Sequence, residues 1–380
     1  MQQGDRAVRG MRILLWYWGR RGGGAHFSLC LARALAQRSA GMALSVSRQG
    51  DLIDAFRALP VPRQEVDTYV DLLGFATGFL RVRSLTRGLV AFAHEQKVDV
   101  VVSAMAHLWT PLVAPALARA GIAYVPVVHD SVQHPGDGDT FWEWRLRREL
   151  GATRAAVALS DCVAAAIAAR RPGLPVIRLP LGALAPSGIA GAIGTAKTSD
   201  VLFFGRIRAY KGLDLLRDAW RLVVAAHPGA TLRVVGQGDI ARAAPGLGDL
   251  PGVTLEPRWV ADEEMAPLLA SARAVVFPYR QASQSGIVPL ALSLGVPAVA
   301  TAVGGLVEQV RDGVSGLVVP PDAAALAAGL LRILDPATRA RLAAGASAEG
   351  ARLADWNSPA TALQDALDRL LGTAAAPARP

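Results

Sequence analysis

The chain has 380 residues, of which 52% are hydrophobic and 6% aromatic, and it carries a formal net charge of +9. This length suits two ordinary domains, and the abundance of Ala, Gly, Leu and Val excludes a disordered chain. The positive charge is compatible with polyanionic or phosphorylated partners. Because the arginines are dispersed and no nucleic-acid module is recognisable, we expect no nucleic-acid partner.

The first half of the chain alternates apolar runs with amphipathic stretches. The run "MRILLWYW" is followed by the glycines Gly22, Gly23 and Gly24 and then by "AHFSLCLARALAQRS", which predicts a strand, a loop and a helix. Buried-strand patterns recur in "MALSVS", "VDVVVSAM", "IAYVPVVHD" and "AAVALS". Such strands, separated by helices, predict a parallel sheet covered on both faces, in a first domain over residues 1–182.

The second half repeats this rhythm after a break. Residues 183–199 are rich in Gly, Ala, Ser and Pro, which is typical of a surface linker. Strands are then predicted in "DVLFFGRI", "TLRVVGQG", "GVTLEP", "RAVVFPY" and "PAVAT", within a second domain over residues 200–355. Residues 356–372 predict a terminal helix that packs back toward the first domain. We therefore expect an α/β protein with two doubly wound domains facing each other across a ligand-binding cleft.

Cysteine content and hydropathy suggest where the protein works. Cys30 and Cys162 each lie in an apolar, helix-like stretch, so a disulfide framework is not expected and a reducing compartment fits. The apolar run from Ile13 to Trp18 is too short for a signal-peptide core or a membrane span, and no later run qualifies. We expect a soluble, cytoplasmic protein that is at most peripheral to a membrane.

Basic residues of the first half favour an anionic surface as that peripheral partner. The segment "FLRVRSLTRGLVAF" carries Arg81, Arg83 and Arg87 among apolar residues, and Arg20 and Arg21 add charge near the start. Such a segment is suited to the inner face of the cytoplasmic membrane. A solvated Arg-rich surface is an equally good interpretation.

Two loops of the second half suit anions. Gly205 and Arg206 directly follow a predicted strand and Lys211 lies at the start of the next helix, so an Arg fork and a Lys point charge can converge on two phosphates. In "RQASQSGIVPLALSLG", the proline of the first turn places the helix start near Ser285 and Gly286, where free amides form an anion site. Either loop alone could be ordinary surface, but two in one domain favour a phosphate-bearing ligand.

These motifs together resemble the retaining glycosyltransferases of family 4, the group 1 glycosyltransferases with the GT-B fold. The resemblance runs from "MRILLWYWGRRGGGAHFSLCLARAL" through "LFFGRIRAYKGLDLL" to "GVPAVATAVGGLVEQVRDGVSGLVVPPDAAALA", its most specific stretch. It implies a sugar nucleotide in the carboxy-terminal domain, with Arg206 and Lys211 on its diphosphate, and an acceptor on the amino-terminal domain. It implies that no cofactor and no metal are required. The co-substrate that it implies is a nucleoside diphosphate sugar.

This chain departs from the family pattern at one motif. The family has a Glu, seven further residues and a second Glu there. The matching positions here are Ala282 and Leu290, neither of which accepts a hydrogen bond from a hydroxyl group. The "SQSG" loop resembles a sub-branch of family 4 with neutral polar side chains in that place. We therefore expect Gln284, with Ser283 or Ser285, to contact the donor sugar instead of the first Glu.

Further roles follow from the same resemblance. His129 matches a cleft-facing His near the reacting sugar, with a structural role in its own loop as an equal alternative, and His134 is a weaker candidate. The Val260 backbone matches the segment that contacts the nucleotide base, beside Trp259, which would either stack on the base or belong to the core. Residues 22–24 match the loop that approaches the donor diphosphate and the acceptor.

Two further motifs have no expected part in sugar transfer. Glu308, in "GGLVEQV", matches a usual family Glu for which we expect a capping role. The three glycines do not form a dinucleotide fingerprint, because Phe27 occupies the third glycine position and no acidic residue ends the "LSVS" strand. A nicotinamide-dependent enzyme is therefore disfavoured.

The sequence thus predicts a glycosyltransferase that moves a sugar from a nucleoside diphosphate sugar to a glycan or lipid-linked acceptor, in cell-surface polysaccharide or lipopolysaccharide biosynthesis. His129, Arg206 and Lys211 are its catalytic candidates, and the amides of Gly286 and Ile287 would help to stabilise charge on the departing diphosphate. The alternatives are a GT-B epimerase or phosphorylase, and a non-catalytic sugar-nucleotide-binding subunit that supports a partner transferase.

Overall fold

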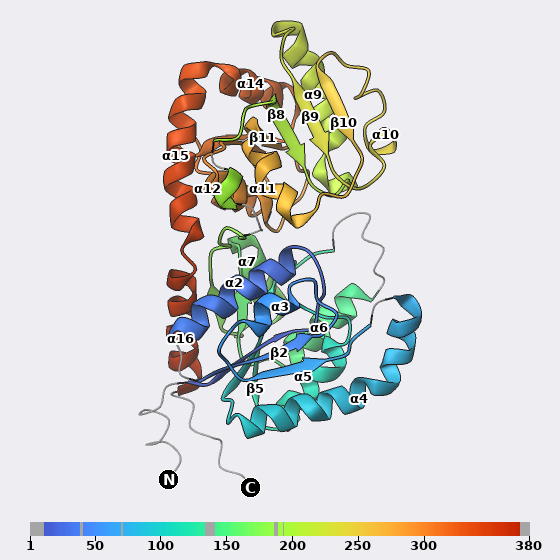
Figure 1. Cartoon of the computed structure of the whole chain (residues 1–380), viewed down its shortest axis with the longest axis vertical. Coiled ribbons are helices and arrows are strands. Elements are labelled where there is room, and N and C mark those ends of the chain that lie inside the picture. Colours follow the sequence, from blue (N-terminus) through green and yellow to red (C-terminus); the bar gives the residue numbers. More distant parts are fainter. Residues whose placement is uncertain are drawn as a thin grey trace. The chain divides into compact units, whose positions relative to one another are not determined.

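The computed structural model describes residues 11–38, 41–69, 71–133, 141–185, 189–192 and 194–372. The chain divides into two compact units (Figure 1). Of the described residues, unit 1 takes those within 11–131, 141–180 and 356–372, and unit 2 takes 132, 133 and those within 181–355.

Unit 1 is built on a seven-stranded parallel sheet with the strand order β3-β2-β1-β4-β5-β6-β7. Its central strands are fully buried runs, as parallel sheets covered on both faces require. The strands are β1 (Ile13–Tyr17), β2 (Met42–Ser47), β3 (Arg63–Val66), β4 (Val100–Ser103), β5 (Ala123–Val128), β6 (Ala156–Ala158) and β7 (Val176–Arg178).

Helices connect these strands and cover the sheet. The helices are α2 (Gly23–Arg38), α3 (Ile53–Arg57), α4 (Leu72–Glu95), α5 (Thr110–Arg119), α6 (Trp142–Gly151), α7 (Asp161–Arg170) and α16 (Asn357–Gly372). Helices α4, α5 and α6 pack in succession, and the terminal helix α16 packs against α2 (Figure 1). At that contact the rings of Phe27 and Trp356 meet edge to face, with centroids 5.3 Å apart. The final helix of the chain therefore belongs to the first unit.

Unit 2 contains a six-stranded parallel sheet with the order β10-β9-β8-β11-β12-β13. The strands are β8 (Ser199–Phe204), β9 (Leu232–Val235), β10 (Val253–Glu256), β11 (Ala272–Phe277), β12 (Ala298–Thr301) and β13 (Gly316–Val319). Starting from β8, the chain first adds strands on one side and then crosses to add β11, β12 and β13 on the other. This reversal creates a topological switch point between β8 and β11.

The helices of unit 2 form two packed groups, α9 with α14 and α12 with α15. Helix α9 illustrates why they form, because Leu213, Leu216, Trp220 and Val223 recur at helical spacing and are all buried. The helices are α8 (Ile189–Ala192), α9 (Leu213–Ala226), α10 (Ile240–Ala243), α11 (Asp262–Ala270), α12 (Ile287–Ser293), α13 (Leu306–Gln309), α14 (Ala323–Leu334) and α15 (Pro336–Ala354), together with the 3-10 turn η1 (Ala209–Lys211).

The prediction of two doubly wound parallel α/β domains is confirmed. The sequence missed the edge strands β3, β7 and β13, since an edge strand is short or carries polar residues, as in "RQEV" of β3. The segment 183–199 differs from a simple surface linker. Leu184 and Ala192 in it are buried, and α8 packs against α11, because these apolar side chains reach the core of unit 2.

Two further sequence expectations concern cysteine and membrane character. Cys30 and Cys162 are both free thiols. Among the described residues, no helix combines the length and the apolar character needed to cross a bilayer.

Candidate functional site

The first candidate site lies at the switch point of unit 2, where ligands of open α/β sheets bind. Gly205 directly follows β8, and the loop 278–286 follows the adjacent strand β11. Both loops therefore start from the carboxyl ends of neighbouring strands. They carry most of the residues that the sequence assigned to the donor.

Lys211 is held at this point by an aromatic partner that the sequence did not indicate. Its Nζ donates a hydrogen bond of 2.6 Å to the hydroxyl of Tyr279 and lies 4.3 Å from the centroid of that ring. Tyr279 is buried, and its carbonyl accepts a bond of 2.5 Å from the Thr301 hydroxyl. A Cβ at Gly205, whose φ is +146°, would lie 3.3 Å from the Lys211 Nζ. The ammonium is thus positioned beside the backbone that follows β8, and it has protons left for an anion.

The two loops are locked together around Lys211. Gly212 adopts a φ of +66°, and a Cβ there would overlap the carbonyl oxygen of Pro278. The Arg280 amide donates to the Tyr210 carbonyl at 2.7 Å, and the Arg280 guanidinium pairs with Asp214 at 2.6 Å. Only a glycine at 212 permits this close approach. The loop geometry is therefore built before any ligand arrives.

Arg206 has a different environment from Lys211. Its side chain is exposed, and it forms no hydrogen bond or ion pair with any residue that the structure describes. A guanidinium in this state keeps all five donors for an anion. The loop after β8 therefore presents one fixed cation and one exposed cation.

The amides at the start of α12 are partly engaged. The Ser285 amide donates to Gln309 Oε1 at 2.8 Å, and Gln309 Nε2 donates back to the Ser285 carbonyl at 2.9 Å. The Ile287 amide reaches the Ser285 hydroxyl at 3.4 Å. Of the two amides expected to be open, that of Gly286 is the one with no hydrogen-bond partner among the described residues. Gln309, the neighbour of Glu308, thus holds the Ser285 backbone at the start of this helix.

The positions of the missing carboxylates are buried. Ala282 and Leu290 are 8% and 1% exposed, and both belong to the core of unit 2. The Ala282 carbonyl accepts a bond of 3.2 Å from the Gly305 amide, and a Cβ at Gly304 would overlap that carbonyl. The loop is thus closely packed where the family pattern has its first Glu.

The neutral polar residues of this loop are also largely enclosed. Ser283 and Ser285 are buried, and Gln284 is half-buried between them.

The segment expected to contact the nucleotide base has one exposed and one buried residue. Trp259 is 57% exposed, which removes a core role, whereas Val260 is buried in the core of unit 2.

The glycine loop of unit 1 lies at the carboxyl end of β1, next to β4, which is the switch point of that sheet. Gly22 has a φ of +75°, and Gly22 and Gly23 are exposed at the start of α2. Gly24 is buried, and a Cβ there would lie 2.7 Å from the Met105 methyl group, which is in the loop after β4. A side chain at residue 24 would therefore require the flexible end of Met105 to shift.

His129 follows β5 and holds its own loop. Its Nε2 donates to the Ala104 carbonyl at 2.8 Å, and its ring meets Phe27 edge to face at 4.9 Å. Burial lowers the pKa of His129, so the imidazole is neutral at neutral pH. His134 lies outside the described residues.

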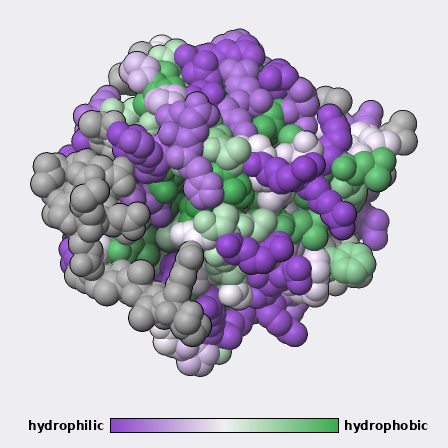
Figure 2. Space-filling view, turned by 90° about the horizontal axis from the view of Figure 1, so that it is seen from below, coloured by the Kyte–Doolittle hydropathy of each residue, from purple (hydrophilic) through white to green (hydrophobic). Residues whose placement is uncertain are grey.

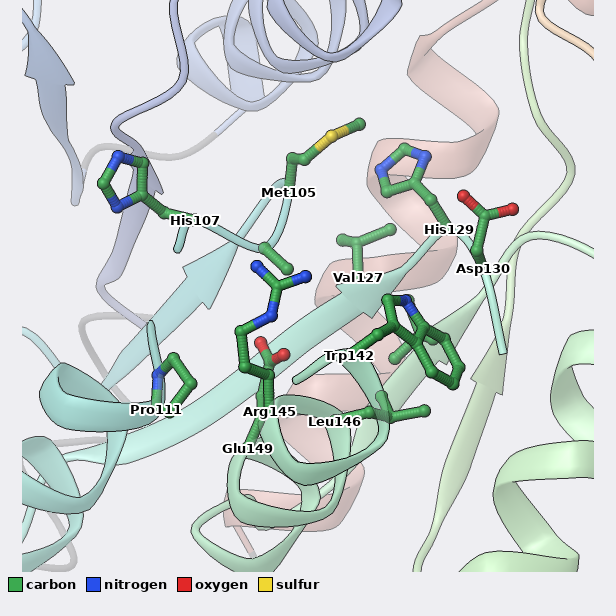
Figure 3. A pocket seen from close by; sticks show the side chains of 12 residues that line it. Met105, His107, Pro111, Val127, His129, Asp130, Trp142, Arg145, Leu146 and Glu149 are labelled. Atoms are coloured by element: carbon green, nitrogen blue, oxygen red, sulfur yellow. The ribbon is translucent and has the colours of Figure 1, made fainter. Parts of the chain in front are cut away.

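His129 also lines a cavity of about 180 Å³ within unit 1 (Figure 3). The cavity lies between the loops after β4 and β5 and the helix α6. Its polar lining residues are His107, His129, Asp130, Arg145 and Glu149. Of these, the sequence had singled out only His129 as a site residue.

His107 is neutral in this cavity. Burial, together with the charges of Arg145 and Arg20, lowers the pKa of His107 to about 3. Its Nδ1 accepts a bond of 3.2 Å from the Trp109 amide, which places the ring proton on Nε2. Two neutral imidazoles therefore border the space.

Glu149 is a buried acid on the same helix as Arg145. The Tyr124 hydroxyl donates a bond of 2.6 Å to its Oε1. Burial raises the pKa of Glu149 to about 7, against the lowering effects of the Tyr124 bond and the Arg145 charge. Its sequence signal was available, because Glu149 shares the buried stripe of α6 with Leu146 and Leu150, where an apolar residue is expected.

The described residues contain no group of three or more His, Cys, Asp or Glu side chains suited to a metal ion.

The family comparison concerns the unit that holds Lys211. The family described as glycosyl transferases group 1 matches residues 198–336. The matched residues include the two loops at the switch point, with Tyr279 and Gln309.

Curated relatives support the same assignment over part of the chain. The D-inositol 3-phosphate glycosyltransferase of Acidothermus cellulolyticus is 33% identical over 172 residues, which cover 42% of this chain and 38% of that protein. The enzyme of the same name from Frankia alni is 36% identical over 191 residues, which cover 46% of each. The matched region thus spans less than half the length of these curated relatives.

Solved structures extend the likeness to both units as a fold. HepE of Anabaena, in complex with UDP and glucose, superposes with a TM-score of 0.71 at 20% identity, over 94% of this chain and 100% of that one. WaaG, a glycosyltransferase involved in lipopolysaccharide biosynthesis, gives a TM-score of 0.64 at 17% identity over 93% of this chain and 99% of that one. The chain has the GT-B type of fold, with two Rossmann-like domains.

Proposed function

We propose that this protein is a retaining glycosyltransferase of family 4 that transfers a sugar from a nucleoside diphosphate sugar to a glycan or lipid-linked acceptor. The observation that carries the proposal is the ammonium of Lys211, fixed by Tyr279 at the switch point of a group 1 glycosyltransferase domain. A preorganised cation there stabilises the charge that grows on a departing diphosphate.

Each cation has a distinct part in this mechanism. Lys211 supplies a fixed point charge, and the exposed fork of Arg206 can close on a second phosphate as the donor binds. The Gly286 amide adds a backbone donor. The acceptor hydroxyl then attacks from the face that the diphosphate leaves, which retains the anomeric configuration, and no cofactor is required.

Recognition of the donor sugar has to differ from the usual family pattern. Ala282 and Leu290 are buried, whereas Gln284 of the same loop is a half-buried polar side chain. We assign the sugar hydroxyls to Gln284, with Ser285, and the base to the Val260 backbone beside the exposed Trp259. Since HepE binds UDP and glucose, UDP and UDP-glucose are the first ligands to test.

A cell-surface glycan is the acceptor process that we propose, at the inner face of the cytoplasmic membrane. Phe79 and Leu80 of α4 are 47% and 86% exposed, beside the exposed side chains of Arg81 and Arg83. Figure 2 shows one face on which hydrophobic residues reach the surface among hydrophilic ones. Binding to vesicles with anionic lipid should exceed binding to neutral vesicles. Equal binding to both would remove this part of the proposal.

The donor assignment is tested by titrating UDP into single variants. Lys211→Ala and Arg206→Ala should each weaken UDP binding by roughly tenfold or more, because each removes a charged hydrogen-bond donor. Arg332→Ala is the matched control, since Arg332 is an exposed cation of the same unit on α14. Unchanged affinity in both site variants would overturn the roles given to these cations.

The alternative of a non-catalytic sugar-nucleotide-binding subunit is favoured by one observation, the absence of carboxylates at residues 282 and 290. The two functions are separated by donor turnover. A binding subunit would bind UDP-sugars without releasing UDP from them.

A further inference from the structure

The cavity of unit 1 contains an acid whose burial needs an explanation. Glu149 is 4% exposed and lines the cavity, although a charged residue at this position of α6 costs solvation. Its Oε1 is occupied by the Tyr124 hydroxyl. Among the described residues, Glu149 has no second hydrogen-bond partner and no ion pair within 4 Å. In Figure 3 its carboxyl group points into the cavity beside Arg145.

The other polar groups of the cavity alternate in hydrogen-bonding character. His107 carries its proton on Nε2 and is a donor, whereas His129 uses its Nε2 proton on Ala104, so its Nδ1 is an acceptor. Arg145 is a donor, and Asp130 and Glu149 are acceptors. Donors and acceptors therefore lie within one small space.

This mixture selects one class of ligand. A bare phosphate has only acceptors at full ionisation and would be repelled by the acidic groups, and an apolar ligand would leave the buried acid unsatisfied. Hydroxyl groups donate and accept at once, so a ring bearing several of them can meet all of these side chains. A space of about 180 Å³ equals that of about six waters at ~30 Å³ each, which is room for one ring.

We infer that this cavity binds one polyhydroxylated ring of the acceptor, with Glu149 accepting a hydrogen bond from a ring hydroxyl and Arg145 donating to a ring oxygen. This inference rests on the proposed transferase function and deepens it. It makes Glu149 a specificity-determining residue of the acceptor side. Tyr124 acts through Glu149, by fixing the carboxyl group from β5.

The cavity can be observed directly in the full-length protein by NMR. Labelling with [methyl-13C]methionine marks the five methionines, of which Met105 lines the cavity, and a Met105→Leu variant assigns its signal. The probes are glucose, galactose, mannose and myo-inositol, each titrated to 100 mM, with inorganic phosphate in parallel. At least one ring should shift the Met105 signal in a saturable manner, and phosphate should not displace it.

Two variants separate the role of Glu149 from stability. Tyr124→Phe keeps the acid in the cavity, and Tyr124→Phe with Glu149→Leu replaces the buried pair by apolar groups without leaving an unpaired partner. The single variant should still bind the ring in a saturable manner, somewhat more weakly than the parent because the carboxyl group is no longer fixed, and the double variant should bind it roughly tenfold or more weakly than the single variant. Circular dichroism checks that both variants fold.

Three results would overturn the inference: no ring shifts Met105, phosphate alone shifts it, or the double variant binds like the single one. UDP titration of the same samples reports on unit 2. Ring binding without UDP binding would therefore refute the proposed function and not the cavity, and UDP binding without ring binding would do the reverse.

Discussion

The buried acid of unit 1 should make the stability of the protein depend on pH in a direction that the structure fixes. Burial raises the pKa of Glu149 from 4.5 to about 7. Between these values the unfolded chain has lost the proton that the folded chain keeps, so the free energy of unfolding falls as the pH rises. A difference of about 2.5 units at ~1.4 kcal/mol per unit gives about 3 kcal/mol. Above pH 7 this group adds no further slope.

The assay compares the parent with Glu149→Gln, which keeps an acceptor for Tyr124 but cannot ionise. Urea-induced unfolding of both proteins from pH 4 to pH 8 gives the difference in their free energies of unfolding, in which other titrating groups cancel. That difference should move by about 3 kcal/mol in favour of Gln as the pH rises. Parallel pH profiles for the two proteins would refute the raised pKa and the burial that causes it.

Two predictions concern the loops at the switch point of unit 2. Gln309→Ala removes both hydrogen bonds to the Ser285 backbone, so calorimetry should show a larger loss of affinity for UDP-glucose than for UDP. Gln309→Glu keeps the acceptor, so its affinity for UDP-glucose should lie between those of the parent and Gln309→Ala. Equal losses of affinity for both ligands would contradict a role at the sugar. Gly212→Ala places a Cβ against Pro278 at a positive φ, so it should lower the free energy of unfolding by at least about 2 kcal/mol. Gly229→Ala is the control, because its Cβ would lie in open space and its free energy of unfolding should be close to that of the parent. A Gly212→Ala variant as stable as the parent would show that the loops are not packed as described.

Much of the architecture follows from local pattern. The runs that became β1 and β5 are apolar over their whole length, because a central strand of a parallel sheet is buried on both faces. The edge strand β3 reads as polar, since one side of an edge strand faces solvent. Pattern therefore predicts the centre of each sheet better than its edges.

The site in unit 2 also has a part that local pattern predicts and a part that it does not. Gly205, Arg206 and Lys211 lie on one loop, so their spacing along the chain was enough to group them. The contacts that position them, from Tyr279 to Lys211 and from Gln309 to Ser285, join residues that are 68 and 24 positions apart. Such long-range contacts depend on strand order, which one sequence does not reveal.

The cavity of unit 1 was the least predictable part. An acid within the apolar stripe of α6 is a visible anomaly, but its meaning depends on Tyr124, which lies 25 positions away on β5. Burial then raises the pKa of Glu149 to about 7. The role that we propose for the cavity therefore depends on packing and not on a motif.

The most direct test of the proposed activity is donor turnover by the full-length protein, followed by 31P NMR with UDP-, GDP- and ADP-sugars. The account predicts release of the free nucleoside diphosphate from one class of donor, at least about a hundredfold slower in Lys211→Ala and unchanged in Arg332→Ala. A protein that binds a sugar nucleotide but releases no nucleoside diphosphate, with or without a hydroxylated ring in the acceptor cavity, would contradict it.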